Sequence, residues 1–392
     1  MRLAGRLDHI EPFYVMECAK AAREIAQGPL CDAARGGRPM IYLNIGEPDF
    51  TAAPLVVEAA ARCMAAGRTQ YTQATGLPEL RDAISRWYRQ RFGLAIDPAR
   101  IVVTAGASAA LQLVTLALVD AGDELLLPDP SYPCNRHFVA AAGGRAVLLP
   151  AGAEHRFQLD AAAVDAAWGS RTRGVLLASP SNPTGTSIER GEMRRIVETV
   201  RARGGFTLVD EIYLGLSYNE AFGHSALEHG DDVIAINSFS KYFGMTGWRL
   251  GWLVLPSALV SAVEKLAQNL YICASSLAQH AALACFEPAS IAEYERRRAA
   301  FRARRDFIVP ALDALGLAVP VPPDGAFYAY ADVSAHAANS WDFCFDLMRR
   351  AQVALTPGRD FGPRSGERFL RLSFASAMPQ LEDAVDRLRR LL

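Results

Sequence analysis

The chain has 392 residues, of which 51% are hydrophobic and 21% charged, and its formal net charge is -1 at pH 7. This composition supplies a substantial core and excludes a disordered chain. The near-neutral charge, without long runs of one sign, argues against nucleic acid or an anionic membrane surface as a partner.

The cysteines and the apolar stretches bear on the compartment. Seven cysteines are scattered along the chain without a C-x-x-C pair, which favours reduced thiols over a disulfide framework or a zinc site. The first twenty residues lack the continuous apolar segment of a signal peptide. The longest apolar stretch, "AALQLVTLALV", is too short to span a bilayer. We therefore expect a soluble cytoplasmic protein with no membrane partner.

Helix and strand patterns alternate through the first two thirds of the chain. Helices are predicted at 54–67 and 78–93, because each stretch begins with proline and ends at glycine. A strand at 100–106 then runs into a helix at 107–122. Further aliphatic runs follow at 123–130, 144–150, 173–180, 206–211 and 232–240. Most of these runs lack polar alternation, so we expect a parallel α/β sheet that is covered on both faces.

Polar residues stand at the ends of several predicted strands, namely Asp129, Ser179, Asp210 and Ser238. In open α/β sheets, ligands bind outside the carboxyl ends of the strands. We expect these residues to converge on one edge of the sheet and to mark the site there.

The pattern changes after about residue 285. A long basic helix at 291–316 is followed by a strand, a helix, a strand and a terminal helix, at 325–333, 341–352, 368–375 and 379–392. These elements predict a smaller α+β unit against which the first forty or so residues pack. The length also suits two domains, and we expect a large domain at 46–285 and a small domain formed by 1–45 and 286–392.

Four short segments contain residues suited to catalysis. They are "SPSNPTG" (179–185), "LVDEIY" with Asp210 and Tyr213, "SFSKYFGMTGWRLGW" (238–252) with Lys241 and Arg249, and "FLRLSFA" with Arg371. Taken singly, each has a structural interpretation: an Asn-Pro turn, a helix N-cap, a solvated lysine and an arginine paired on an edge strand. Lys241 is nevertheless one of only three lysines among 41 basic residues. Arginine stays protonated, whereas a lysine in apolar surroundings can lose its proton and attack a carbonyl.

In this order and spacing the motifs resemble those of the class I and II aminotransferases, which are pyridoxal-phosphate enzymes of fold-type I. The matching pattern is N-P-x-G, then D-x-x-Y, then S-x-S-K with an arginine eight residues beyond the lysine, then the arginine of "LRLSFA". The resemblance runs from "NIGEPDF" to "LRLSFA" and implies an α/β fold with a mostly parallel sheet between helices and a smaller α+β domain.

The resemblance implies a role for each matching residue around the cofactor ring. Lys241 would form the Schiff base with the cofactor aldehyde and would then move the proton. Asp210 would hold the protonated ring nitrogen. Asn182 and Tyr213 would donate to the phenolic oxygen, and Tyr132 would stack on the ring.

Further matches concern the cofactor phosphate and the substrate. The backbone of Gly106, Ala107 and Ser108, at a helix start, would bind the phosphate together with the side chains of Ser238, Ser240 and Arg249. Tyr71 would reach it from a partner subunit, which implies a homodimer with shared active sites. For the substrate carboxylate, the matching residues are Arg371, Gly46 and Asn182, with Arg368 a weaker candidate.

The resemblance therefore predicts an aminotransferase that moves the amino group of an α-amino acid to a 2-oxo acid. A pyridoxal-phosphate lyase that cleaves a Cβ–S bond remains the alternative, because the same cofactor residues serve both reactions. Phe13, Tyr14 and Arg136 are candidates for the substrate side-chain pocket or for simple packing. We expect no metal site, and we expect surface or structural roles for His224 and His229.

Overall fold

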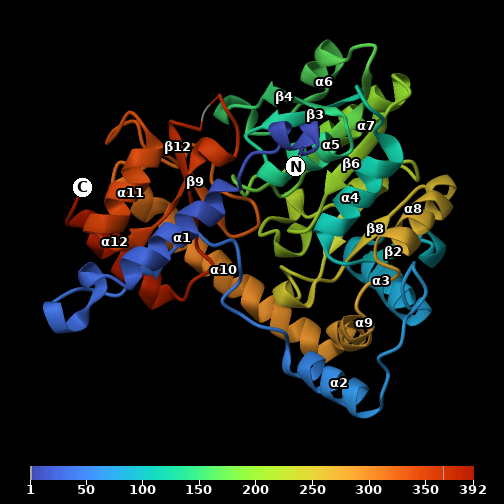
Figure 1. The fold of residues 1–392 in the computed structure, drawn as a ribbon, viewed down its shortest axis with the longest axis horizontal. Helices are drawn as coiled ribbons and strands as arrows, with labels where there is room; N and C mark the ends of the chain where they lie inside the picture. The colour runs from blue at the N-terminus through green and yellow to red at the C-terminus, as the bar shows by residue number, and fades with distance from the viewer. Residues whose placement is uncertain (1, 365) are drawn as a thin grey trace.

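The structure is a computed structural model that describes residues 2–364 and 366–392, and its largest element is a seven-stranded sheet (Figure 1). The strand order is β2–β8–β7–β6–β5–β3–β4. Neighbouring strands are parallel except for β8, which runs antiparallel to β7 and to β2. The bounds are β2 Ile101–Thr104, β3 Glu124–Asp129, β4 Arg145–Pro150, β5 Thr172–Ala178, β6 Phe206–Asp210, β7 Ile234–Ser238 and β8 Gly251–Val254.

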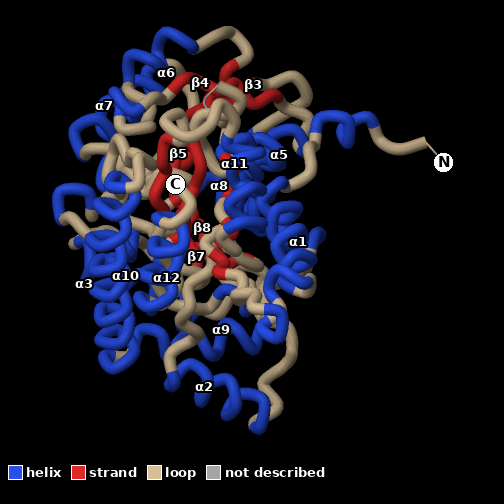
Figure 2. The backbone as a smooth tube through the Cα atoms, turned by 90° about the vertical axis from the view of Figure 1, so that its left-hand side faces the viewer, coloured by secondary structure: helices blue, strands red, loops and turns tan. Residues whose placement is uncertain are grey.

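Helices cover both faces of this sheet (Figure 2). On one face, Leu125 and Leu127 pack in a cluster with α4 Ala107–Leu118, α5 Pro133–Ala141 and α8 Ser257–Leu270. On the other face, Leu126 belongs to a larger cluster with α3 Pro78–Phe92, α6 Ala161–Ala167 and α7 Arg190–Ala202. Alternate residues of β3 thus face opposite clusters, as the pleat of a strand requires. The expected fold class, with a mostly parallel sheet between helices, is confirmed.

A three-stranded antiparallel sheet lies in the C-terminal third, with β12 Phe369–Ser373 between β9 Tyr328–Asp332 and β11 Thr356–Pro357. A two-stranded parallel ladder joins β1 Ile41–Tyr42 to β10 Val353–Ala354. Helix α1 Tyr14–Ala26 lies beside α11 Ser340–Arg350 in this part of the molecule (Figure 1). The N-terminal segment therefore packs against elements that follow it by more than 300 residues.

The remaining helices connect these sheets. Helix α10 Pro288–Ala314 is the long helix predicted at 291–316, and it runs from the lower part of the molecule toward the three-stranded sheet (Figure 1). It buries Tyr294, Phe301 and Ile308 along one side. The other helices are α2 Pro54–Ala65, α9 Ser276–Ala282 and α12 Met378–Arg389. Among the described residues, we find no helix with both the length and the apolar character needed to cross a membrane.

The sequence analysis missed strand β8. Its four residues begin at Gly251, within the lysine-containing segment 238–252, and its pairing partners are β7 and the distant β2. A strand this short has no periodicity of its own, so only these tertiary pairings define it.

Candidate active site

A cavity of about 390 Å³ opens at the carboxyl edge of the parallel strands, between the large sheet, α1 and the three-stranded sheet. Nearly all the residues predicted from the motifs line it. They are Gly46, Ala107, Ser108, Tyr132, Asn182, Asp210, Tyr213, Ser238, Ser240, Lys241, Arg249 and Arg371. Residues separated by more than 300 positions in the chain thus meet in one space.

Lys241 follows the turn after β7 and points into this cavity. Its Nζ donates a hydrogen bond to the carbonyl oxygen of Gly46 at 2.6 Å. Burial, together with the positive charges of Arg371 and Arg249, lowers the pKa of Lys241 to about 8, against the opposing effect of the Glu47 and Asp210 carboxylates. The amine is therefore close to its neutral, nucleophilic form near pH 7, so the interpretation as a solvated surface lysine is wrong.

The polar residues at the strand ends separate into two groups. Asp210 and Ser238 line the cavity, as expected. Asp129 and Ser179 do not line it, because their side chains accept hydrogen bonds from the backbone of Arg364 and Ile188. For these two residues the expectation of a site role is wrong, since the polar atoms are used to hold neighbouring loops.

Asp210 ends β6 and is buried, and no α-helix begins after it. Its Oδ1 accepts a hydrogen bond from the backbone N–H of Ile212 at 3.1 Å. Burial raises the pKa of Asp210 to about 7. At this pKa the carboxyl is about half ionised at neutral pH, and a positively charged ligand atom beside it would favour the ionised form.

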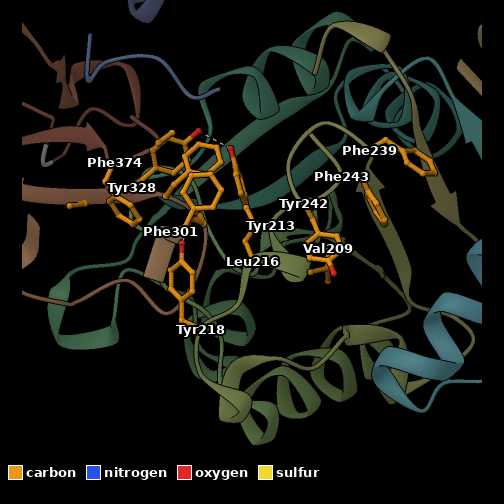
Figure 3. Close-up of a cluster of buried hydrophobic side chains, with 14 of the residues drawn as sticks. Val209, Tyr213, Leu216, Tyr218, Phe239, Tyr242, Phe243, Phe301, Tyr328 and Phe374 are labelled. Carbon is orange, nitrogen blue, oxygen red and sulfur yellow. Dashed lines mark hydrogen bonds between the residues drawn. The ribbon is translucent and has the colours of Figure 1, made fainter. Parts of the chain in front are cut away.

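Tyr213 contacts a residue that the motifs did not indicate. Its hydroxyl lies 2.8 Å from the hydroxyl of Tyr328 on β9 (Figure 3). Tyr328 also lines the cavity, and a Cβ on Gly46 would overlap its hydroxyl. Glycine at position 46 therefore lets the backbone come close to the Tyr328 ring and present its carbonyl to Lys241.

Arg371 lies on β12, the central strand of its sheet, and is only 3% exposed. Its Nη1 donates to Oδ1 of Asn182 at 2.8 Å, and its Nη2 donates to the carbonyl oxygen of Asn44 at 2.9 Å. Its Nε has no partner among the described residues. The interpretation as an edge-strand arginine in a structural ion pair is wrong. A buried guanidinium with neutral neighbours and a free N–H is suited to binding an anion.

The start of α4 has features that are suited to binding a second anion. Gly106 precedes the helix with φ +85°, a conformation that favours glycine, and a Cβ there would lie 2.9 Å from Nη2 of Arg249. The first N–H groups of α4, the Arg249 guanidinium and the hydroxyl of Ser238 thus surround one end of the cavity. Helix N-termini with a nearby cation bind phosphate groups.

This arrangement can be compared with known proteins. The family model described as "Aminotransferase class I and II" matches residues 38–388. The chain belongs to this family. Membership in this family identifies the chain as a transaminase. The aminotransferases of this family use pyridoxal phosphate as their cofactor.

Individual relatives agree with this assignment. The valine–pyruvate aminotransferase of Mycobacterium tuberculosis is 38% identical over 383 residues, which cover 97% of this chain and 96% of that protein. An aspartate aminotransferase of Geobacillus stearothermophilus is 32% identical, with 100% and 99% of the two chains covered. The structure of aspartate aminotransferase from Thermus thermophilus with maleate superposes with a TM-score of 0.91 at 32% identity and covers both chains completely. These relatives favour transamination, and none of them supports the lyase alternative.

Two residues predicted for the aminotransferase site lie outside the cavity lining. Gly106 lies close to the Arg249 guanidinium, which itself lines the cavity. Tyr71 is 77% exposed on the surface of its own subunit and does not line the cavity.

Other predictions for the substrate pocket are only partly confirmed. Phe13 lines the cavity. Tyr14 and Arg136 line a separate and larger surface groove of about 920 Å³, and Arg136 donates to the carbonyl oxygen of Asp360. Arg368, the weaker candidate for the substrate carboxylate, pairs with Asp332 and is largely exposed.

Several lining residues were not predicted. Met16, Ala19 and Arg23 come from one side of α1, and Ile45, Glu47 and Leu111 complete that part of the wall. The spacing of Met16, Ala19 and Arg23 places them on one helical face, which was a usable signal. Which surface that face meets is defined by tertiary packing alone.

Proposed function

We propose that Lys241 binds pyridoxal phosphate covalently and that the site uses it to transfer the amino group of an apolar α-amino acid to a 2-oxo acid. The observation that carries the proposal is the position of Lys241 Nζ in one cavity with Asp210, Arg249 and Arg371, with its pKa lowered to about 8. Bound pyridoxal phosphate supplies an aldehyde that condenses with amines and a ring that withdraws electrons.

The residues present fit the charges of this cofactor. At one end, the α4 N-terminus, Arg249 and Ser238 provide N–H groups, a cation and a hydroxyl for a phosphate. At the other end, Asp210 is a buried carboxyl that requires a cationic partner, and a protonated pyridine nitrogen provides one. Tyr132 also lines the cavity and offers an aromatic surface on which a ring can stack.

Lys241 serves in this proposal as the covalent anchor and as the base. When it is not bound to the cofactor, Nζ would accept a proton from the substrate Cα and would hold it for return. A pKa of about 8 matches this task, since the group must both lose and regain a proton near neutral pH. Asn182 and Tyr213, which also line the cavity, would donate hydrogen bonds to the phenolic oxygen of the cofactor.

Arg371 is proposed to bind the substrate α-carboxylate, with help from Asn182 and the backbone of Gly46. The guanidinium stands 4.5 Å from the centre of the Tyr328 ring, so its plane is held while its free N–H remains available. A planar fork of donors matches a carboxylate in geometry as well as in charge.

The apolar part of the cavity lining indicates the proposed substrate class. Phe13, Met16, Ala19, Ile45 and Leu111 give this region an apolar surface, with Arg23 as an exposed residue among them. Burial of an aliphatic side chain against such a surface contributes roughly 0.8 kcal/mol for each methylene. The relative that is named a valine–pyruvate aminotransferase supports the same class.

We also propose a cytoplasmic homodimer in which Tyr71 of the partner subunit completes the phosphate site. Tyr71 is exposed together with other large apolar side chains, including Val57, Met64, Leu270 and Ile272. The seven free cysteines support a reducing compartment. Within each subunit, we propose that residues 46–285 form the large domain, and that 1–45 with 286–392 form the small domain.

The test is the half-reaction of the reconstituted enzyme with single amino donors, followed by the absorbance of the bound cofactor. We expect alanine and valine to convert the enzyme to its pyridoxamine form faster than aspartate does, with no release of ammonia. Preferred reaction with aspartate would contradict the substrate class. Steady release of ammonia and pyruvate, with the cofactor unchanged, would contradict transamination.

A further inference from the structure

A second cluster of reactive side chains lies away from the active-site cavity, in the connection between β6 and β7. It consists of His224, Glu228 and His229, and one ligand atom of each lies within 4.8 Å of the others. The two histidine side chains are 1% and 8% exposed, and that of Glu228 is 18% exposed. None of the three residues lines the cavity, so the chemistry described above leaves them unexplained.

One ring nitrogen of each histidine, Nδ1 of His224 and Nε2 of His229, lacks a hydrogen-bond partner among the described residues. His224 Nε2 lies 3.1 Å from the carbonyl oxygen of Ile188, a contact that assigns the proton to Nε2 and leaves a lone pair on Nδ1. That Nδ1 faces Oε1 of Glu228 at 3.9 Å and has no hydrogen bond. His229 Nε2 lies 3.3 Å from the same oxygen and also has no hydrogen bond.

Two buried ring nitrogens and a carboxylate oxygen thus lie close together without a hydrogen bond between them. Buried polar atoms in native proteins nearly always have a partner, so each exception calls for an explanation. Other charges lie around the cluster. Arg190 pairs with the second carboxylate oxygen of Glu228 at 3.1 Å, and Arg194, Glu198 and Arg201 lie near His229. Because Arg190 is 61% exposed and uses Oε2, Oε1 remains free to face the rings.

We propose that His224, Glu228 and His229 bind a divalent transition-metal ion of the zinc type. Two imidazoles and one carboxylate form a donor set that zinc accepts and that calcium and magnesium do not favour. Zinc bonds of about 2.0–2.1 Å to such ligands require donor atoms roughly 3.4 Å apart. The distances of 3.3 and 3.9 Å to Oε1 are already close to this value. A water molecule would complete the fourth position.

The position of the cluster indicates a structural role for the ion. Ser225, next to His224, donates from its hydroxyl to the carboxyl of Glu211, and the N–H of Ala226 donates there as well, at 2.9 and 2.7 Å. Glu211 directly follows Asp210 in the chain. A metal at the cluster would therefore tie down the loop that packs behind the strand end carrying Asp210, without taking part in the reaction.

The test uses chelator-treated holoenzyme that is titrated with zinc chloride against a chromophoric zinc indicator. His229→Gln and Glu228→Gln each remove one donor, and His155→Gln is the matched control, because His155 is 55% exposed and pairs with Asp160 elsewhere. We expect the wild type and the control to bind one zinc ion per chain, and the two cluster variants to bind at least about tenfold more weakly. Zinc should raise the melting temperature of the wild type and the control only, and magnesium should leave it unchanged.

The controls address other zinc-binding groups. The cofactor and the surface cysteines are shared by all four proteins, so only the difference between them reports on the cluster. His224 is fully buried and hydrogen-bonded, so its replacement would test folding as well as binding and is not needed. Equal zinc affinity in the wild type and both cluster variants, or the absence of stoichiometric binding in the wild type, would overturn the proposal.

Discussion

The hydroxyl of Tyr213, in the turn after β6, lies 2.8 Å from the hydroxyl of Tyr328 on β9 (Figure 3). Both side chains are almost completely buried, and the second belongs to the C-terminal sheet. The hydrogen bond thus fixes the position of a proposed cofactor donor from across the cavity.

Removal of one of these two hydroxyls should lower the free energy of unfolding more than removal of both. Tyr328→Phe leaves the buried Tyr213 hydroxyl without its partner, and we expect the free energy of unfolding to fall by about 1–2 kcal/mol. The double variant Tyr213→Phe/Tyr328→Phe should recover part of this loss, as measured by urea denaturation of the apoprotein. Additive losses in the double variant would show that the two hydroxyls do not interact.

Replacement of Arg371 should lower kcat/KM for amino donors that carry an α-carboxylate and should leave it unchanged for donors that lack one. Arg371→Lys keeps the charge but removes the fork, and with it charge-assisted hydrogen bonds that are worth about 1.5–3 kcal/mol each. We expect kcat/KM for alanine to fall by roughly 100-fold, mainly through KM. An amine donor without a carboxylate serves as the control and should react at the wild-type rate. An equal loss for both donors would assign Arg371 a structural role.

The lowered pKa of Lys241 predicts how covalent loading of the apoprotein depends on pH. Only the neutral amine attacks an aldehyde, so the rate should rise tenfold per unit below pH 8 and level off above it. An ordinary lysine would titrate near 10.5 instead. Stopped-flow absorbance after mixing with pyridoxal phosphate measures this profile, and a midpoint near 10.5 would contradict the electrostatic account of the site.

Shared active sites can be tested by mixing two defective variants. Lys241→Ala removes the anchor of its own site, and Tyr71→Ala removes the proposed contact to the neighbouring site. In a hybrid dimer of the two variants, one site carries both defects and the other carries neither. Random pairing of equal amounts makes about half of the dimers hybrids, so about a quarter of all sites in the mixture should be intact. Activity should therefore reappear after the two proteins are unfolded and refolded together, without added free cofactor. If Tyr71 acts within its own subunit, the mixture will stay inactive.

The sequence predicted those features that depend on short segments. The buried strands appear as aliphatic runs, and residues such as Asp210 and Lys241 follow them directly, so their meeting at one edge of the sheet follows from parallel topology. Tyr328 was missed because its place depends on the register of β9 against β12, where it lies opposite Ser373. Pairing between distant strands leaves no local signal.

The lack of a local signal also explains why the sequence did not predict the proposed metal site or the apolar part of the cavity lining. Glu228 and His229 are adjacent and His224 precedes them by four residues, a spacing that matches no common metal motif. Their ligand atoms converge only because the loop between β6 and β7 folds into short turns. Met16 and Ala19 likewise face the cavity because α1 packs beside the C-terminal elements.

The central claim is that the side-chain amine of Lys241 holds the cofactor covalently. Borohydride reduction of the holoenzyme, followed by proteolysis and mass spectrometry of the labelled peptide, tests it directly. We predict the reduced cofactor on Lys241, with no label in Lys241→Ala even though that variant still binds the cofactor noncovalently. A label on Lys20 or Lys265, or an unlabelled chain, would contradict the account.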